Sequence, residues 1–313
     1  MRKDHIIKGV LMCLLASVAW GAMFPVAESA FTYLDPFYFS VIRYSAVSLI
    51  LVVLLWIKEG RKALSLGGRG KSLWMFGTMA FTVYNLLVFW GQNQLGTSGV
   101  ILASVMEALM PILSVILLWI VKQRKPEPPT IICITVALIG CFMVITKGDM
   151  SVFVQGSLFP VLLVLLGVIG WVVYTIGGSQ FKDWSVLRYS TLTCVLGTAT
   201  SAAIVLFLTA LGILHAPTFH MVYSAGFELS FMILIAGLFA LISWNTGIKL
   251  LTPVNGILFI NFVPVTTFII TVLQGHSMTV YDIGGTLLII AALVSNNLYQ
   301  RRRGSLAAAG AAH

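Results

Sequence analysis

The sequence predicts an all-α polytopic membrane protein, with ten transmembrane helices arranged as two inverted five-helix repeats. Its 313 residues are 59% hydrophobic and only 9% charged, whereas soluble domains carry about 25% charged residues. Most of the chain consists of apolar runs of about 20 residues, the length that crosses a hydrocarbon layer about 30 Å thick. A third observation is an arginine-bearing hexapeptide that occurs once in each half of the chain.

The spans are placed by hydropathy and by the Gly, Pro and charged residues that separate them. They are expected at residues 7–27, 37–57, 73–94, 98–121, 129–146, 157–177, 187–211, 229–248, 253–274 and 280–299. The first run is long enough to span, so we expect a transmembrane helix there and no cleavable signal peptide. The connections are too short for a separate soluble domain. Residues 304–313 are expected to be a linker or tag remnant.

The basic residues orient these spans. Nearly all of the 19 Lys and Arg fall in the N-terminal segment, in alternate loops, or at the C-terminal end. The exceptions are Lys147, in an opposite-side loop, and Arg43, within a span. Basic loops stay cytoplasmic in bacterial membrane proteins, so both termini are expected in the cytoplasm of a bacterial inner (plasma) membrane. The net charge of +9 follows from this bias and does not indicate nucleic-acid binding.

The hexapeptide SVIRYS (Ser40–Ser45) recurs as SVLRYS (Ser185–Ser190). Five spans per repeat is an odd number, so two such repeats must lie in opposite orientations in the membrane. The repeats are expected at residues 1–150 and 151–303. Other positions match as well: Trp20 with Trp171, and the mid-span Pro111 with Pro264. A proline leaves a carbonyl without its backbone donor, which the bilayer tolerates beside protein or a water-filled cavity.

Taken together, these features resemble the drug/metabolite transporter superfamily, and within it the EamA-type exporters of the aromatic amino acid group. The resemblance rests on the five-plus-five repeat, the paired arginine motifs, the prolines of spans four and nine, and turns at Thr97–Ser98 and Thr252–Pro253. SWNTGIKLLTP in span eight and GWVVYT in span six are also similar to that group. One departure is that EamA-type halves usually place a glutamate after spans four and nine, where this chain has Glu127 and His276.

Ionisable residues at mid-membrane are functional candidates by default. Glu107, one turn before Pro111, is expected to be a proton-titrating or amine-binding carboxylate that lines a cavity; the alternative is a structural carboxylate paired with a polar helix. Asn261 is its approximate counterpart before Pro264. Asn85 and Asn245 add polar faces, with interhelical hydrogen bonding as the alternative.

Aromatic residues near these polar positions could form a cavity wall that favours flat or cationic guests, or could face lipid. They are Trp20, Tyr84, Trp171, Tyr174 and Trp244. Arg43 and Arg188 are expected to be structural charges, with binding of a substrate group, for Arg43 a carboxylate, as the alternative. Arg43 lies within reach of Glu28, Asp35 or helix-end carbonyls at the interface, and Arg188 within reach of Asp183 or lipid headgroups.

The leading functional hypothesis is a secondary transporter that exports small metabolites, above all amino acids including aromatic ones, by alternating access. The chain has no P-loop motif to bind ATP, and no cofactor or metal site is expected. Its expected partners are a small-molecule substrate and the lipid bilayer, with the protein a monomer or a homodimer. Export of cationic drugs or quaternary ammonium compounds, or carriage of nucleotide sugars, is the alternative. An intramembrane enzyme is a remote third hypothesis, because none of the five histidines lies at mid-span.

Overall fold

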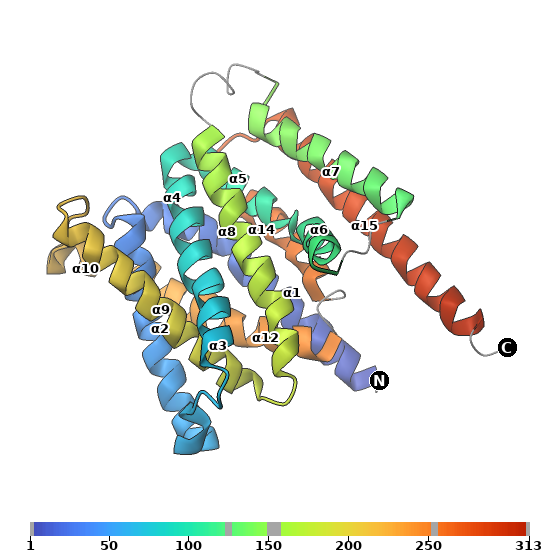
Figure 1. The fold of residues 1–313 in the computed structure, drawn as a ribbon. Coiled ribbons are helices and arrows are strands. Elements are labelled where there is room, and N and C mark those ends of the chain that lie inside the picture. The colour runs from blue at the N-terminus through green and yellow to red at the C-terminus, as the bar shows by residue number, and fades with distance from the viewer. Residues whose placement is uncertain (1–2, 123–126, 149–157, 252–255, 311–313) are drawn as a thin grey trace.

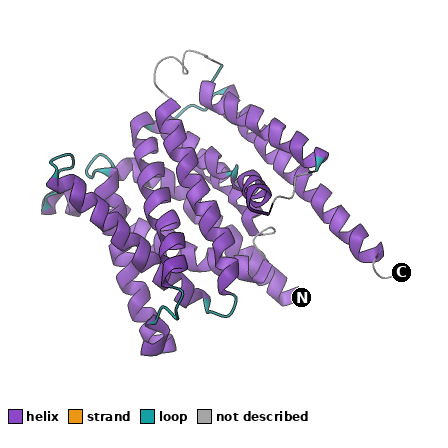
Figure 2. Ribbon diagram, viewed as in Figure 1, coloured by secondary structure: helices purple, strands orange, loops and turns teal. Residues whose placement is uncertain are grey.

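The computed structural model describes residues 3–122, 127–148, 158–251 and 256–310, and within these ranges it is helical without strands (Figures 1 and 2). The first half contains α1 (Lys3–Ala30), α2 (Pro36–Glu59), η1 (Arg61–Leu64), α3 (Gly70–Gly77), η2 (Thr78–Tyr84), α4 (Asn85–Leu95), α5 (Thr97–Glu107), α6 (Met110–Lys122) and α7 (Pro128–Thr146). The second half contains α8 (Leu158–Gly177), η4 (Gly178–Phe181), α9 (Val186–Ala210), α10 (Phe219–Ser224), α11 (Gly226–Phe231), η5 (Met232–Phe239), α12 (Ala240–Leu251), η6 (Ile257–Asn261), α14 (Phe262–Leu273) and α15 (Val280–Gly310).

Each of the ten expected spans falls on apolar helix. Among the described residues, seven continuous helical stretches are long and apolar enough to cross a membrane, and α5 with α6 forms an eighth that is bent by 51°. The ninth and tenth spans contain shorter apolar helices, Ile257–Leu273 and Val280–Asn296. The Thr252–Pro253 turn lies outside the described residues. The tail is helical as far as Gly310. That residues 304–313 are a linker or tag remnant stays a prediction.

The pairing of helices follows the inverted repeat. α1 packs along α12, and the corresponding pair α8 and α4 packs in the same way. Equivalent helices of the two halves also contact each other: α2 with α9, α5 with α14, and α7 with α15. Figure 1 shows α7 and α15 side by side at one edge of the bundle. The exchange of partners is what a two-fold relation between the halves requires.

Two irregularities also recur in both halves. The third and eighth spans each contain a π-helical segment, η2 and η5. π-Helical turns are rare and are often found at functional sites. The fourth span bends just before Pro111, and the ninth narrows to the 3-10 segment η6 just before Pro264.

Close backbone approach holds the edge pair α7 and α15 together. A Cβ added to Gly140 would lie 2.5 Å from the Gly285 carbonyl oxygen, and one added to Gly285 would lie 2.5 Å from the Gly140 carbonyl oxygen. Small residues at such crossings let helices pack tightly in a membrane, where apolar association gives no net driving force.

The helix caps set the depth of the two arginine motifs. Asp35 caps α2 by accepting a hydrogen bond from Phe37 N, and Pro36 occupies the first helical position, where it is well tolerated. In the second repeat Ser185 is itself the cap of α9 and accepts a hydrogen bond from Arg188 N at 2.9 Å. Arg43 therefore lies about two turns into its helix, whereas Arg188 lies in the first turn.

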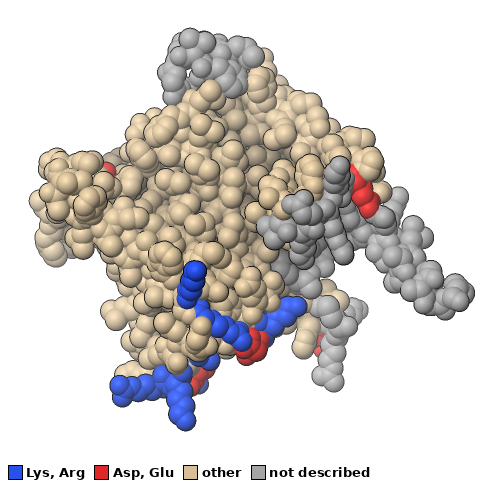
Figure 3. Space-filling view, viewed as in Figure 1, with Lys and Arg blue, Asp and Glu red and all other residues tan. Residues whose placement is uncertain are grey.

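Lys and Arg gather at one end of the molecule (Figure 3). We call this the basic end. It is formed by the α2–α3 and α8–α9 connections, which carry Lys58, Arg61, Lys62, Arg69 and Lys182.

Candidate functional site

A cavity of about 430 Å³ lies at the basic end, between the α8–α9 connection and α12. Tyr189 and Asn245 line its inner part, and Trp184 and Lys249 line its outer part. The Lys249 ammonium donates a hydrogen bond to the Trp184 carbonyl at 2.7 Å. Asn245 Nδ2 donates to the hydroxyls of Tyr174 and Ser190, both at 2.8 Å. The cavity therefore reaches inward to a fixed set of hydroxyl and amide groups.

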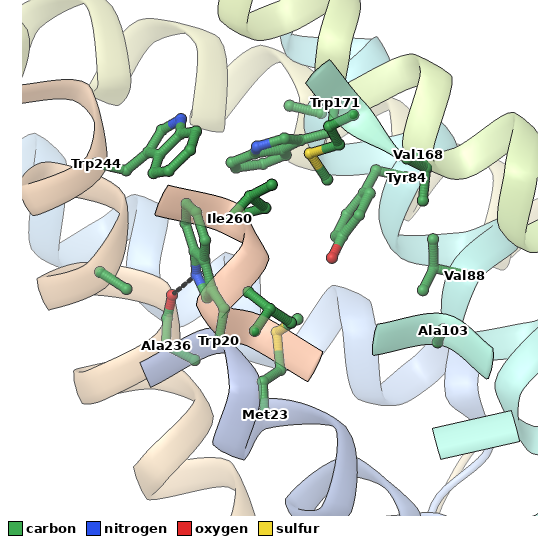
Figure 4. Close-up of a cluster of buried hydrophobic side chains, with 14 of the residues drawn as sticks. Trp20, Met23, Tyr84, Val88, Ala103, Val168, Trp171, Ala236, Trp244 and Ile260 are labelled. Atoms are coloured by element: carbon green, nitrogen blue, oxygen red, sulfur yellow. Dashed lines mark hydrogen bonds between the residues drawn. The ribbon is translucent and has the colours of Figure 1, made fainter. Parts of the chain in front are cut away.

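Beyond this cavity five rings meet in the centre of the bundle. This aromatic cluster consists of Trp20, Tyr84, Trp171, Tyr174 and Trp244, which come from α1, η2, α8 and α12 and are all buried (Figure 4 labels four of them). Trp171 is the hub, because its ring lies 5.2 Å from each of the rings of Trp20, Tyr84 and Tyr174. Trp20 also lies 5.1 Å from Trp244. Such edge and tilted contacts are the preferred geometry of aromatic pairs.

The polar atoms of the cluster differ in their partners. The Trp20 indole N–H donates to the Ala236 carbonyl of η5 at 3.0 Å (Figure 4), which satisfies one backbone group that the π-helical winding leaves available. Within the described part of the chain, the indole N–H groups of Trp171 and Trp244 have no partner. Buried donors of this kind normally find an acceptor, so these two can serve a polar guest.

Glu107 is the last residue of α5, at the bend of the fourth span, and it is 2% exposed. One carboxylate oxygen accepts a hydrogen bond from the Tyr84 hydroxyl, and the other has no partner among the described residues. The bend places this carboxylate at a break in regular helix. Half of its hydrogen-bonding capacity is left for another group.

An unbroken series of contacts joins the cavity to Glu107. Tyr189, which lines the cavity, stacks on Tyr174 at 5.3 Å with an interplanar angle of 15°. Tyr174 contacts Trp171, Trp171 contacts Tyr84, and Tyr84 binds Glu107. The aromatic cluster therefore lies between the cavity at the basic end and the buried carboxylate.

The asparagines do not act as one group. Asn85 is fully buried, and its Nδ2 donates at 2.7 Å to the Ala80 carbonyl inside η2, so it supports the π-helical segment. Asn261 lines a different cavity, of about 340 Å³, between α14 and α15. The structure therefore brings Asn245 to the aromatic cluster and leaves Asn261 apart from it.

Neither arginine forms the ion pair that the sequence suggested, and the expected contact of Arg188 with lipid headgroups stays a prediction. Arg43 meets neither Glu28, which accepts a hydrogen bond from Thr97, nor Asp35, which caps α2. The reason is that α1, α4 and η5 cover Arg43, so its guanidinium is fully buried and does not reach the interface. Arg188 does not pair with Asp183, which is bound by Arg69 at 2.8 Å. It lies 3.8 Å over the Trp184 ring and donates to the Ser65 carbonyl at 2.7 Å.

Sequence reasoning missed Tyr189, which lines the cavity, and Tyr44, its counterpart in the first hexapeptide. The hexapeptide contained the signal, since each tyrosine directly follows its arginine, but the arginine drew attention first. In the described ranges no group of three His, Cys, Asp or Glu could hold a metal ion. The four cysteines are free.

Comparison with known proteins gives the class of this helical bundle: a membrane transporter. The EamA-like transporter family model matches this chain twice, over residues 7–146 and 158–298, and the chain belongs to the EamA-like transporter family. It is 50% identical, over 96% of its length and 95% of the relative's, to the uncharacterized transporter YrdR of Bacillus subtilis (strain 168). It is 28% identical, over 91% and 92%, to the uncharacterized transporter YyaM of the same organism.

A solved crystal structure is similar to this fold, with a TM-score of 0.68, 17% identity, and 96% of this chain and 99% of that chain covered. The family and the fold are those of the drug/metabolite transporter superfamily, as the sequence resemblance implied. The names of the family and of both relatives are those of transporters.

Proposed function

We propose that this protein is a secondary transporter that exports amino acids, including aromatic ones, across the bacterial plasma membrane by alternating access. The observation that carries the proposal is Glu107, a buried carboxylate joined to the basic-end cavity by the contacting rings of Tyr189 and the aromatic cluster. A carboxylate in this position can bind a substrate ammonium group or carry a proton. Aromatic faces beside it favour flat side chains and cations.

The arrangement of cavities supports alternating access. A second cavity, of about 190 Å³, lies at the opposite end of the molecule, where Ile101 and Leu102 of α5 line it together with Asp282. Glu107 ends the same helix. Bent or broken helices near a repeat interface are the usual site of substrate binding in inverted-repeat transporters. With the basic end in the cytoplasm, the larger cavity takes substrate from inside the cell.

The test is flux in proteoliposomes loaded with labelled Phe, Thr or Lys, with protein-free liposomes as the control. We expect protein-dependent efflux of at least one of them. Absence of flux for all three contradicts the amino acid proposal.

A second candidate, export of organic cations, is favoured by the same aromatic cluster beside a single buried carboxylate. It predicts that quaternary ammonium compounds compete for transport and that neutral or zwitterionic amino acids do not. Competition in one liposome preparation separates the two cargo classes.

A further inference from the structure

Arg43 is a buried cation without an anion. Its side chain has no exposed surface, and within the described residues the only ion pair closer than 4 Å is Arg69–Asp183. An arginine cannot give up its proton in a protein, so the charge remains. A buried charge without a partner costs several kcal/mol in real proteins, which makes its presence here a feature that needs a reason.

The groups around the guanidinium satisfy little of its hydrogen-bonding capacity. Nη2 donates to the Tyr44 hydroxyl at 2.8 Å, and the remaining polar contacts are to the sulfurs of Met23 and Met232, at 3.7 Å and 3.8 Å. Thioether sulfur is a weak acceptor. Nε has no partner. The ring centroids of Tyr44 and Phe89 lie 4.4 Å and 5.2 Å from the guanidinium carbon, and the faces of these rings stabilise the charge.

These neighbours come from both halves of the protein. Met23 is in α1, Phe89 is in α4 and Met232 begins η5, so spans one, two, three and eight meet at this arginine. Methionine side chains are flexible and can repack around different partners. A guanidinium covered by two methionines at a junction of the repeats can be uncovered when the halves move.

Arg43 is also connected to the basic-end cavity through a series of contacting rings. Tyr44 contacts Phe81 at 5.0 Å, and Phe81 contacts Tyr174 of the aromatic cluster at 5.7 Å. Tyr174 in turn stacks on Tyr189, which lines the basic-end cavity. A continuous series of ring contacts therefore joins Arg43 to a residue that lines the cavity.

We infer that Arg43 binds the carboxylate of a transported amino acid. This binding occurs in a conformation in which the two methionines have moved away from the guanidinium. The inference rests on the proposed function and deepens it by naming the substrate group that is recognised. The planar guanidinium presents parallel N–H donors that match the two oxygens of a carboxylate. The unpartnered Nε and the weak sulfur contacts are the donors available for it.

The experiment compares labelled Phe with labelled phenethylamine, the same molecule without its carboxylate, in proteoliposomes of the wild type, Arg43→Met and Arg43→Lys. Loss of a charge-assisted hydrogen-bonded contact should raise the KM for Phe by about tenfold to a hundredfold in Arg43→Met. Transport of phenethylamine should be unaffected. Arg43→Lys keeps the positive charge but lacks the parallel N–H donors of the guanidinium, so its KM for Phe should lie between those of the wild type and Arg43→Met. Arg61→Gln removes an exposed arginine at the basic end and should change neither substrate.

A second measurement does not depend on transport. The carboxylate 3-phenylpropionate should raise the melting temperature of the purified wild type and leave that of Arg43→Met unchanged. Wild-type protein with no Phe flux but with this thermal shift contradicts the proposed function and supports carboxylate binding by Arg43. An Arg43→Met variant that keeps the wild-type KM for Phe, or wild type that shows no shift, overturns carboxylate binding by Arg43. Should Arg43→Met fail to fold, Arg43→Lys takes its place in both measurements.

Discussion

The hexapeptides Ser40–Ser45 and Ser185–Ser190 differ at one position, yet their arginines lie in opposite surroundings. Arg43 is fully buried, and its one oxygen contact is the Tyr44 hydroxyl. Arg188 lies at the basic end, over the Trp184 ring, and donates to a backbone carbonyl. The two helices start at different distances from the motif, so the same residues reach different depths. Among the described residues, Arg43 and Glu107 are buried charges without an ion pair, whereas at the basic end Arg69 is paired with Asp183 and Arg188 is held by a ring and a backbone carbonyl.

The largest effect should come from Glu107, a second buried charge that has no ion pair among the described residues. Glu107→Gln should lower amino acid flux by about tenfold to a hundredfold, since an ionised hydrogen-bonding partner is lost, and should remove the dependence of flux on pH. Asp183→Asn makes the same chemical change at the basic end and should leave flux near the wild-type value. If Glu107→Gln and Asp183→Asn lowered flux equally, the buried carboxylate would have no special role compared with the carboxylate at the basic end.

The next effect concerns stability. Arg43→Met replaces a buried unpaired charge by an apolar side chain between two methionines, and should leave the free energy of unfolding unchanged or raise it by about 1–3 kcal/mol. Arg188→Met should lower it by about 1 kcal/mol, because a cation–π contact and a hydrogen bond are lost. Thermal unfolding of both variants in one detergent measures the contrast. A strongly destabilised Arg43→Met would mean that the interior arginine holds the fold together.

Tyr84→Phe should have a smaller effect. It removes the hydroxyl that donates to Glu107 and should cost about 1–2 kcal/mol, since a buried carboxylate loses its donor. Tyr189→Phe removes a hydroxyl that donates to the Tyr174 carbonyl beside the cavity, where a lost partner matters less. Thermal unfolding of the two variants should rank Tyr84→Phe as the less stable; the reverse order would place the critical hydroxyl at the cavity.

The smallest effect should come from the exposed pair at the basic end. The pKa of the Asp183 carboxyl lies below its usual range because the Arg69 guanidinium donates two hydrogen bonds to it. A group whose pKa is lowered by folding stabilises the protein at neutral pH, and this contribution disappears as the pH falls through the lowered pKa. Asp183→Asn should therefore lower the melting temperature slightly at neutral pH and not in acid. High salt should remove the difference as well.

The sequence was sufficient to predict the ten apolar spans and the inverted repeat, because both depend on composition summed over about 20 residues and on loop charge. Glu107, Trp20, Trp171 and Tyr84 could be selected because polar and aromatic residues stand out in apolar runs. The structure then brings them into contact through Trp171.

Hydropathy could not predict which way a side chain faces within the bundle. Arg43 is close enough to the helix end to reach the interface from an isolated helix, and only the packing of α1, α4 and η5 over it prevents this. Asn261 matches Glu107 along the chain, but its side chain lines the groove between α14 and α15. The π-helical winding of η2 and η5 alters which residues share a face of the third and eighth spans. A prediction based on a period of 3.6 residues does not account for this winding.

Those two π-helical segments have a mechanical consequence. A π turn closes hydrogen bonds between residues i and i+5, so it winds more residues into each turn than an α-helix does. A change from a π turn to an α turn, or the reverse, shifts the helix register by one residue. A span that contains such a segment can therefore change its length slightly while it stays helical. These segments lie in the third and eighth spans, which correspond in the two repeats. Both halves of this transporter therefore have the same means of small axial adjustment, next to the aromatic cluster.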